Sequence, residues 1–448
     1  MQKKVLLAII LVFLILFTAS CNRDTDETED PDSPGNGSGQ VADGSWGFDY
    51  VNKFSEGFAS VYKIGEGGWG YIDKTGKLFV PHSFNLAAPY KGGVAIVSIS
   101  SGDEDRPYLH SLLNTNGQLL AVFEYIHIGE FSEDLAMVTK IVEEEDEYDN
   151  VLNEYERRGY IGKDGKIVIP CEFDEALDFS EGLAAVSIDY LFGYIDKTGE
   201  TIIPFAYEHA SSFSEGLASV YSQGKYGFID ATGKVAIPIE FDYAGSFKEG
   251  LAMAAKSEDE ESAKWGYIDK AGRTVIPFVF AAVSDFVDGI GLASLGDGSG
   301  YAFIDMTGRV IAKHSDFVSV HGFSEGLAAV RYGDKWGYID KTGRLAIPCE
   351  YESVSEQGFS NGLVMAKKDN MWGFINRAGE AVVPFQYNAA FDFSDGFAVV
   401  VQNGKCGVIN EAGEVVIPFE HDFISYVAEG LAFAQSNDRG WKLLVLTQ

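Results

Sequence analysis

The sequence predicts an all-β fold, a tandem array of about eleven repeats of roughly 34 residues with three strands each. A motif of the form Trp-Gly-Tyr-Ile-Asp recurs at spacings of 34 to 36 residues wherever nothing is inserted. Glycine is abundant, at 51 residues, and aromatic residues make up 13% of the chain. Many short strands joined by tight turns would give this composition.

The repeated motif fixes the register of the array. Its full copies begin at Trp69, Arg158, Phe192, Tyr226, Trp265, Tyr301, Trp336, Trp372 and Cys406. A degenerate copy lies near His110, and half-copies lie at Trp46 and Trp441. Eight of the twelve prolines occupy one further position of the repeat: Pro81, Pro170, Pro204, Pro238, Pro277, Pro348, Pro384 and Pro418.

One unit illustrates the predicted strands. Residues Leu183–Val186 form the first strand and Gly193–Ile195 the second. Asp196–Gly199 is expected to be a type I turn whose glycine takes the left-handed conformation of a bulged hairpin. Thr201–Ile203 forms the third strand, which Pro204 should end because proline has no N–H to donate. Strands that are apolar on both faces must be covered by neighbouring units.

These motifs resemble the WG repeat family of bacterial proteins over about residues 45–448. The resemblance implies interaction modules at bacterial surfaces, without a common enzymatic activity. Three strands in 34 residues favour an open, curved, β-solenoid-like array, because a β-propeller blade needs four strands. A propeller-like closure is the alternative, in which the terminal half-copies would complete a ring.

The N-terminus has the pattern of an export signal. Lys3 and Lys4 precede an apolar run over 5–17, and small residues lead to Cys21. This ending resembles the lipobox of bacterial lipoproteins, which implies cleavage after Ser20 and lipidation of Cys21. We therefore expect a lipoprotein signal peptide over 1–20, an acidic, Pro/Gly/Ser-rich flexible tether over 21–44, and the β array over 45–448. The expected location is the cell envelope, anchored by lipid and facing outward from the outer membrane or cell surface.

The charge of the chain limits its partners. The formal net charge is −33, which would repel a phosphate backbone, so nucleic-acid binding is not expected. Such a surface could attract basic proteins or divalent cations, although acidic residues also simply favour solubility.

No constellation of residues indicates catalysis, a cofactor or a metal site. The repeated turn aspartates, such as Asp196, are explained by bonds to backbone N–H groups. The seven histidines share no repeat position. Cys171, Cys349 and Cys406 are expected to be small buried side chains in units too distant for a disulfide. The motif tryptophans are expected to pack in the core, although an exposed ladder of them could bind sugar rings.

Three insertions depart from the repeat in an organised way. All lie between the Phe-Ser-Glu-Gly-Leu-Ala element and the next Trp-Gly motif, and equivalent loops of an array project from one side. The insertions are acidic and form a possible binding rim that comprises Asp103, Glu104, Asp105, Glu143, Glu144, Glu145, Asp146, Glu147, Glu258, Asp259, Glu260 and Glu261.

These features favour a non-enzymatic, surface-tethered interaction scaffold that binds a protein partner. A glycan-binding module on the cell envelope is the alternative, and it would require exposed motif tryptophans.

Overall fold

The structure is a computed structural model that describes residues 40–41, 48–104, 107–121, 123–145, 151–257, 263–295, 300–313, 317, 319–436 and 441–446. They belong to one compact unit, Gly37–Gln448. The predicted leader and most of the tether, including Cys21, lie outside these residues. Within them no helix is long and apolar enough to span a membrane. Their one helix is the short 3₁₀ turn η1 (Ile64–Glu66).

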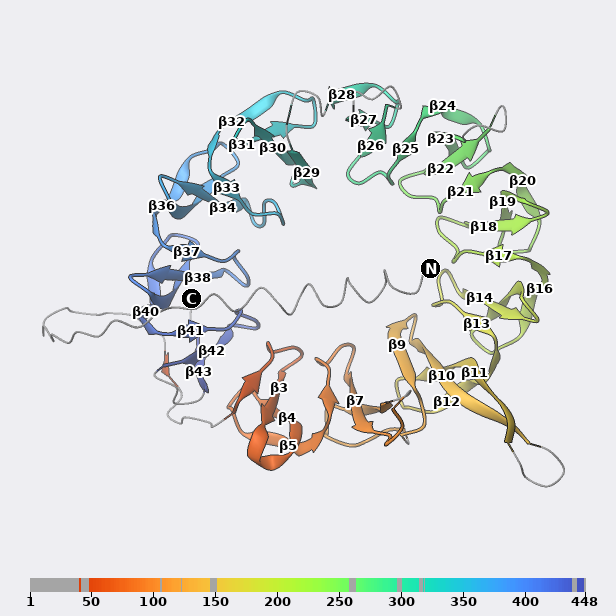
Figure 1. Cartoon of the computed structure of the whole chain (residues 1–448), viewed down its shortest axis with the longest axis horizontal. Helices are drawn as coiled ribbons and strands as arrows, with labels where there is room; N and C mark the ends of the chain where they lie inside the picture. The colour runs from red at the N-terminus through yellow and green to blue at the C-terminus, as the bar shows by residue number, and fades with distance from the viewer. Residues whose placement is uncertain are drawn as a thin grey trace, which may run out of the picture. The chain divides into compact units, whose positions relative to one another are not determined.

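The described residues form eleven small antiparallel sheets in chain order (Figure 1). The strands of the first six are β2 (Tyr50–Val51), β3 (Phe58–Lys63), β4 (Gly68–Asp73), β5 (Leu78–Phe84); β6 (Leu86–Ala87), β7 (Val94–Ser100), β8 (Tyr108–Asn114); β9 (His127–Ser132), β10 (Leu135–Glu145), β11 (Val151–Gly162), β12 (Ile167–Phe173); β13 (Glu175–Ala176), β14 (Leu183–Ile188), β15 (Leu191–Asp196), β16 (Thr201–Tyr207); β17 (His209–Ala210), β18 (Leu217–Ser222), β19 (Lys225–Asp230), β20 (Val235–Phe241); β21 (Tyr243–Ala244), β22 (Leu251–Lys256), β23 (Lys264–Asp269), β24 (Thr274–Phe280).

The strands of the other five sheets are β25 (Ala282–Val283), β26 (Ile290–Ser294), β27 (Tyr301–Asp305), β28 (Val310–Lys313); β29 (Ser319–Ser324), β30 (Leu327–Tyr332), β31 (Lys335–Asp340), β32 (Leu345–Tyr351); β33 (Ser353–Val354), β34 (Leu363–Lys368), β35 (Met371–Asn376), β36 (Ala381–Tyr387); β37 (Ala389–Ala390), β38 (Phe397–Gln402), β39 (Lys405–Asn410), β40 (Val415–His421); and β41 (Phe423–Ile424), β42 (Leu431–Gln435), β43 (Trp441–Val445), β1 (Gln40–Val41).

The expectation of an open solenoid with three strands per repeat is wrong: the sheets form an eleven-bladed β-propeller, and ten of them have four strands among the described residues. Most first strands, such as β13, have only two residues, too few to give an alternating sequence signal. The last blade takes its fourth strand from the start of the described residues, since β1 pairs antiparallel with β43. The all-β class is confirmed, and the ring closes as in the alternative. The closing pair joins the half-copy strand of Trp441 to Gln40–Val41 in the predicted tether, and the half-copy at Trp46 lies outside the described residues.

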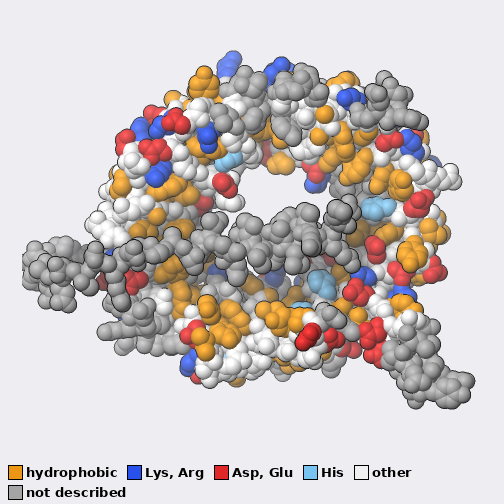
Figure 2. Space-filling model, in the orientation of Figure 1, with side chains coloured by type: hydrophobic (Ala, Val, Ile, Leu, Met, Phe, Trp, Pro, Cys, Tyr) orange, Lys and Arg blue, Asp and Glu red, His pale blue; other side chains and the backbone are white. Residues whose placement is uncertain are grey.

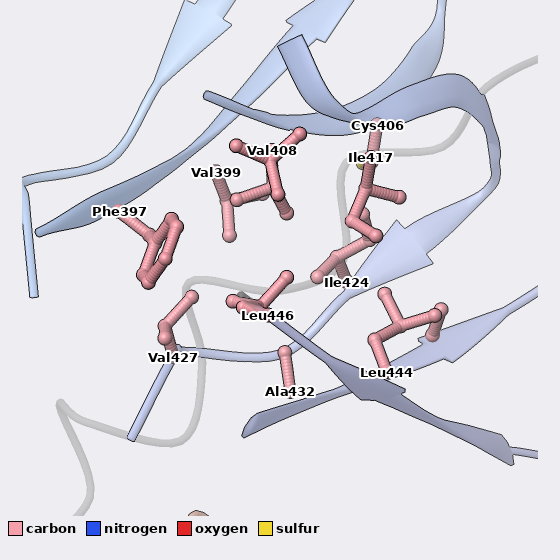
Figure 3. Close-up of a cluster of buried hydrophobic side chains, with 12 residues drawn as sticks. Phe397, Val399, Cys406, Val408, Ile417, Ile424, Val427, Ala432, Leu444 and Leu446 are labelled. Carbon is pink, nitrogen blue, oxygen red and sulfur yellow. The ribbon is translucent and has the colours of Figure 1, made fainter. Parts of the chain in front are cut away.

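Apolar clusters between adjacent blades hold the ring together. Each of eleven clusters among the described residues combines side chains from two successive sheets. In the cluster of Figure 3, Phe397 and Val408 from one blade meet Ile424 and Leu444 from the next. The cluster that closes the ring includes Phe54 from the first blade, which stacks on Phe433 from the last with ring centroids 5.5 Å apart. The continuous core of a repeat array therefore becomes circular.

The repeated prolines were expected to end their strands, but they lie inside them. Pro204 is in the middle of β16, where the pairing with β15 shifts register between Phe192 and Tyr194. Proline is tolerated there because the strand is at the edge of its sheet and bulges. A Cβ on Gly193 of the Trp-Gly motif would lie 2.6 Å from the carbonyl oxygen of Ile203. The bulged chain therefore requires glycine opposite it.

The exceptions support this coupling of glycine to proline. Three sheets carry Ser111, Ala302 or Lys442 at the glycine position, and none of the eight repeated prolines belongs to these sheets. Ala302 instead pairs directly with Lys313 in a ladder without a bulge at that point. Glycine and proline are therefore lost together because each accommodates the other.

The predicted bulged hairpins are confirmed. Gly199, Gly233 and Gly343 have φ of 89°, 81° and 81°. The Gly199 N–H donates to the carbonyl of Asp196 at 3.0 Å, and the Asp196 carboxylate accepts N–H groups from Thr198 and Glu200 at 2.8 and 3.0 Å. These bonds account for the repeated aspartates.

The Phe-Ser-Glu-Gly elements form a second type of turn, which also joins neighbouring blades. Glu181 and Gly182 both have positive φ, of 56° and 84°, as in the type I′ turn of a two-residue hairpin. Ser180 Oγ donates to the carbonyl of Phe213 at 2.7 Å, and the Glu181 carboxylate accepts the N–H of Gly216 at 2.9 Å. Equivalent bonds to the next blade are made by the carboxylates of Glu56, Glu133, Glu215, Glu249, Glu325 and Glu429.

Candidate binding surface

In each sheet a hairpin joins the second and third strands. At that end of the sheet, side chains that lie opposite one another on neighbouring strands form a row. In the β17–β20 sheet, His209 on β17 is opposite Tyr221 on β18, and Tyr221 is opposite Tyr226 on β19. The motif tryptophan occupies the third-strand position of this row, as Trp265 does on β23. Directly opposite residues on one face interact across a sheet, so aromatic residues in this row contact one another.

Across three successive blades these rows join into an aromatic arc, formed by Phe192, His209, Tyr226, Tyr243 and Trp265. Adjacent ring centroids along the arc are 5.8, 6.3, 5.5 and 4.9 Å apart. Their planes are inclined by 47° to 67°. Each ring is therefore tilted against its neighbours, an arrangement that aromatic pairs favour.

The arc is partly open to solvent. His209 and Tyr243 are exposed, Tyr226 and Trp265 are half-buried, and Phe192 is buried. Burial raises the pKa of Tyr226, and the neighbouring Tyr243 and Tyr221 add to this effect. The arc thus presents two exposed and two half-buried aromatic side chains beside the buried Phe192.

A pocket of about 490 Å³ adjoins the Phe192 end of the arc. Its walls come from β11, from the start of β13, from the β14–β15 hairpin and from the segment before β17. Aromatic side chains in the wall are Tyr155, Tyr190 and Phe192, and Arg157 is the one basic residue. Ser187 and five carboxylates complete it, namely those of Glu156, Asp174, Glu175, Asp189 and Glu208. We call this the Tyr190 pocket.

Arg157 and Asp174 are bound to each other within the pocket. They form a direct ion pair in which both side chains are about one-third exposed. Asp174 also accepts the N–H of Asp189 at 2.7 Å, and the Arg157 guanidinium lies 5.6 Å from the ring centroid of Tyr155. The positive charge of the pocket is thereby already balanced.

The predicted acidic rim is only partly within the described residues. Asp103 and Glu104 lie in the β7–β8 connection, and Asp103 is half-buried with its N–H bonded to Ser101 Oγ at 2.9 Å. Glu143 is exposed on β10, opposite Glu154 on β11. Glu144 and Glu145 belong to the same strand. Asp105, Asp146, Glu147, Glu258, Asp259, Glu260 and Glu261 lie outside the described residues.

All three insertions connect the second and third strands of their sheets, so their flanking strands end at the same side of the blades as the aromatic row. In Figure 1 the paired strands β10 and β11 extend beyond the outer edge of the ring. In Figure 2 acidic side chains gather at the lower right, over the part of the ring that contains β11 to β16.

The motif tryptophans do not form an exposed ladder. Trp69, Trp265, Trp336, Trp372 and Trp441 are half-buried, and each packs against an inter-blade cluster. Trp46 lies outside the described residues. The residues that complete the arc, His209 and Tyr243, were missed by the sequence reasoning. They open two-residue strands, and the signal in the sequence is an aromatic residue two positions after the end of the proline-containing strand.

Two apolar pockets lie on the other side of the blades, of about 260 and 350 Å³. Each adjoins an unusually long first strand, β9 or β29. Each follows a blade that lacks the glycine–proline pair. In these two places the chain passes from one blade to the next without a bulged proline-containing strand. We attribute both pockets to this different connection.

No group of three or more His, Cys, Asp or Glu side chains in the described ranges is placed to hold a metal ion. Cys406 is buried, and Cys171 and Cys349 are half-buried with free thiols. Burial raises the pKa of Cys171 to about 11, so this thiol stays protonated.

Comparison with solved structures gives only distant likenesses. A crystal structure of the eukaryotic initiation factor shares 11% identity with a TM-score of 0.40, covering 83% of this chain and 95% of that one. The extracellular domain of a hybrid two-component system from B. thetaiotaomicron shares 12% identity with a TM-score of 0.23, covering 88% and 62%. Puromycin hydrolase shares 13% with a TM-score of 0.29, covering 58% and 49%. No curated protein matches the chain.

The family comparison covers most of the ring. The profile described as "WG containing repeat" matches nine segments: 69–101, 159–191, 192–226, 226–257, 265–297, 301–336, 336–372, 372–406 and 407–439. Each match begins at or next to the Trp-Gly position and runs through the third and fourth strands of one blade into the first two strands of the next. The sequence repeat is thus offset by half a blade from the structural one. Because these segments span more than half of its length, the chain belongs to the WG repeat family.

Proposed function

We propose that this protein is a non-enzymatic interaction scaffold, tethered to the cell surface by a lipid on Cys21, that binds a protein partner through the aromatic arc. The observation that carries the proposal is the run of five contacting rings with exposed His209 and Tyr243. Tyrosine and tryptophan are enriched at protein interfaces because they combine a large apolar surface with a polar tip.

The tilt of the rings favours a protein over a glycan. A sugar ring stacks on the flat face of an aromatic side chain, but adjacent rings of the arc are inclined by 67° and 48° and so offer no common flat face. Its apolar rings, tyrosine hydroxyl groups and imidazole suit a mixed polar and apolar protein surface. Glycan binding is the competing proposal, and the same experiment tests it.

The test compares two doubly substituted forms of a chain of residues 21–448 that carries Cys21→Ser. The His209→Ser/Tyr243→Ser form changes the arc. The matched Tyr332→Ser/Tyr426→Ser form removes two tyrosines outside it that are 68% and 64% exposed. We expect the unsubstituted protein and the control variant to capture the same envelope or extracellular proteins. The arc variant should fail to capture them. Equal capture by both variants would contradict the proposal, and arc-dependent retention of a polysaccharide instead would establish the glycan alternative.

The anchor has its own test. Cys21→Ser removes the thiol that would carry the lipid, so the full-length protein should move from the membrane fraction to the soluble fraction. Immunoblotting of the two fractions measures this change, with Cys171→Ser as the control that retains the anchor. Unchanged membrane association of the Cys21→Ser protein would refute lipid tethering.

A further inference from the structure

The backbone at the rim of the Tyr190 pocket adopts an unfavourable conformation. Asp189 and Tyr190 are the central residues of the β14–β15 hairpin, with φ of 52° and 66°. Two equivalent hairpins place Gly224 and Gly404 at the second of these positions and a third places Asn370 there, residues that adopt a left-handed backbone at less cost than tyrosine. The side chain of Tyr190 is 90% exposed, so burial does not offset the strain. Strain of this kind is typical of functional sites.

The charge of the pocket indicates the type of ligand. Arg157 is paired with Asp174, and Glu156 binds Arg158 at 3.0 Å. No ion pair joins Glu175, Asp189 or Glu208 to a lysine or arginine within the described part of the chain. These carboxylates share a cavity with three aromatic rings. A cation gains both from carboxylates and from the face of an aromatic ring.

We propose that the Tyr190 pocket binds the cationic side chain of an arginine or lysine of the partner, an inference that rests on the proposed function. Tyr190 supplies an open ring face, and Asp189 and Glu208 supply negative charge. The carboxylates do not converge as a metal site requires, since no metal-holding group is found among the described residues. A planar guanidinium can instead contact a ring and separate carboxylates at once.

The pocket and the aromatic arc are continuous. Phe192 lines the pocket and is the first ring of the arc, 5.8 Å from His209. Glu208 in the pocket wall precedes His209 in the chain. A partner segment that lies along the arc would therefore bring a basic side chain to the pocket at one end.

The experiment uses a fluorescein-labelled hexa-arginine peptide and the Cys21→Ser chain of residues 21–448, at about 0.15 M salt to screen diffuse attraction. Tyr190→Gly and Glu208→Gln alter the pocket. Glutamine retains the acceptor for the Gln223 N–H that Glu208 binds at 3.0 Å. Tyr332→Ser and Glu411→Gln are the controls, because both residues are exposed outside the pocket and the second carries the same charge change.

We expect fluorescence anisotropy to show binding weakened about two- to fivefold by each pocket variant, and roughly tenfold by the two together, with little change in the controls. Tyr190→Gly should also raise the melting temperature, because it relieves strain. Equal affinity of pocket variants and controls would overturn the proposal. In the partner-capture assay, a partner lost only with the arc variant would refute the pocket but leave the proposed function intact, whereas a partner lost with neither would refute both.

Discussion

At the scale of single residues, the Trp-Gly motif owes its glycine to the neighbouring strand. A Cβ on Gly337 would lie 2.5 Å from the carbonyl oxygen of Ile347 and 2.7 Å from the carbonyl carbon of Pro348. Backbone atoms cannot move aside as a flexible side chain can. The motif therefore reflects a local packing requirement and needs no ligand to explain it.

Gly337→Ala should destabilise the protein by about 1–3 kcal/mol, as overpacking usually does. Ala302→Gly is the matched control, because its sheet has no bulged proline and already accepts a Cβ. This change should cost only about 0.5–1 kcal/mol through added chain flexibility. Thermal and urea unfolding measure both effects. An equal loss of unfolding free energy in the two variants would contradict the close approach of the neighbouring strand to Gly337.

At the scale of elements, turn glutamates bind seven of the eleven blades to the next among the described residues. The Glu215 carboxylate accepts the Gly250 N–H at 3.2 Å and pairs with Lys270 at 2.9 Å. Glu133 and Glu429 make the same two contacts with Gly182 and Lys197 and with Gly57 and Lys74. The bond from Lys270 lowers the pKa of Glu215, against an opposing effect of burial. The left-handed glutamates are thus held by charge-assisted bonds.

These contacts predict a pH dependence of stability. A glutamate whose folded pKa is lowered below 4.5 stabilises the protein above that pH, and this contribution is lost as the pH falls through the lowered value. Glu215→Gln should cost up to about 1 kcal/mol at neutral pH, because the side chain is partly exposed. The difference from the unsubstituted protein should vanish in acid. Urea unfolding from pH 7 to pH 3 measures it, and a constant difference would exclude the charged interaction.

The β10–β11 hairpin permits a separate prediction about the acidic rim. Glu143 is exposed on β10, which pairs with the pocket-lining strand β11. Replacing Glu143, Glu144, Glu145 and Glu147 with Gln should slow association with a basic partner, most strongly at low salt, because charge steers encounter. Stopped-flow mixing with the captured partner at several salt concentrations tests this, with unfolding as the control for stability. Wild-type rates at every salt concentration would make the rim a solvated decoration.

At the scale of the whole molecule, the periodic features were predictable and the closure was not. The register, the bulged hairpins and the two-sided packing each repeat many times in the sequence. Ring closure depends on a single event, in which Gln40 and Val41 pair with Val445 and Leu444. The aromatic arc likewise combines residues from different positions of the repeat, such as Tyr243 and Trp265, which become neighbours only in the folded sheet.

The closed ring is the central claim, and zero-length cross-linking tests it most directly. Lys74 Nζ in the first blade lies 2.9 Å from the Glu429 carboxylate in the last. The pairs Lys197–Glu133 and Lys270–Glu215 have the same geometry, at 3.0 and 2.9 Å, but join adjacent blades in either architecture. Carbodiimide treatment of the monomer should give all three linked peptides by mass spectrometry. Recovery of the two control links without the Lys74–Glu429 link would contradict the ring and indicate an open array.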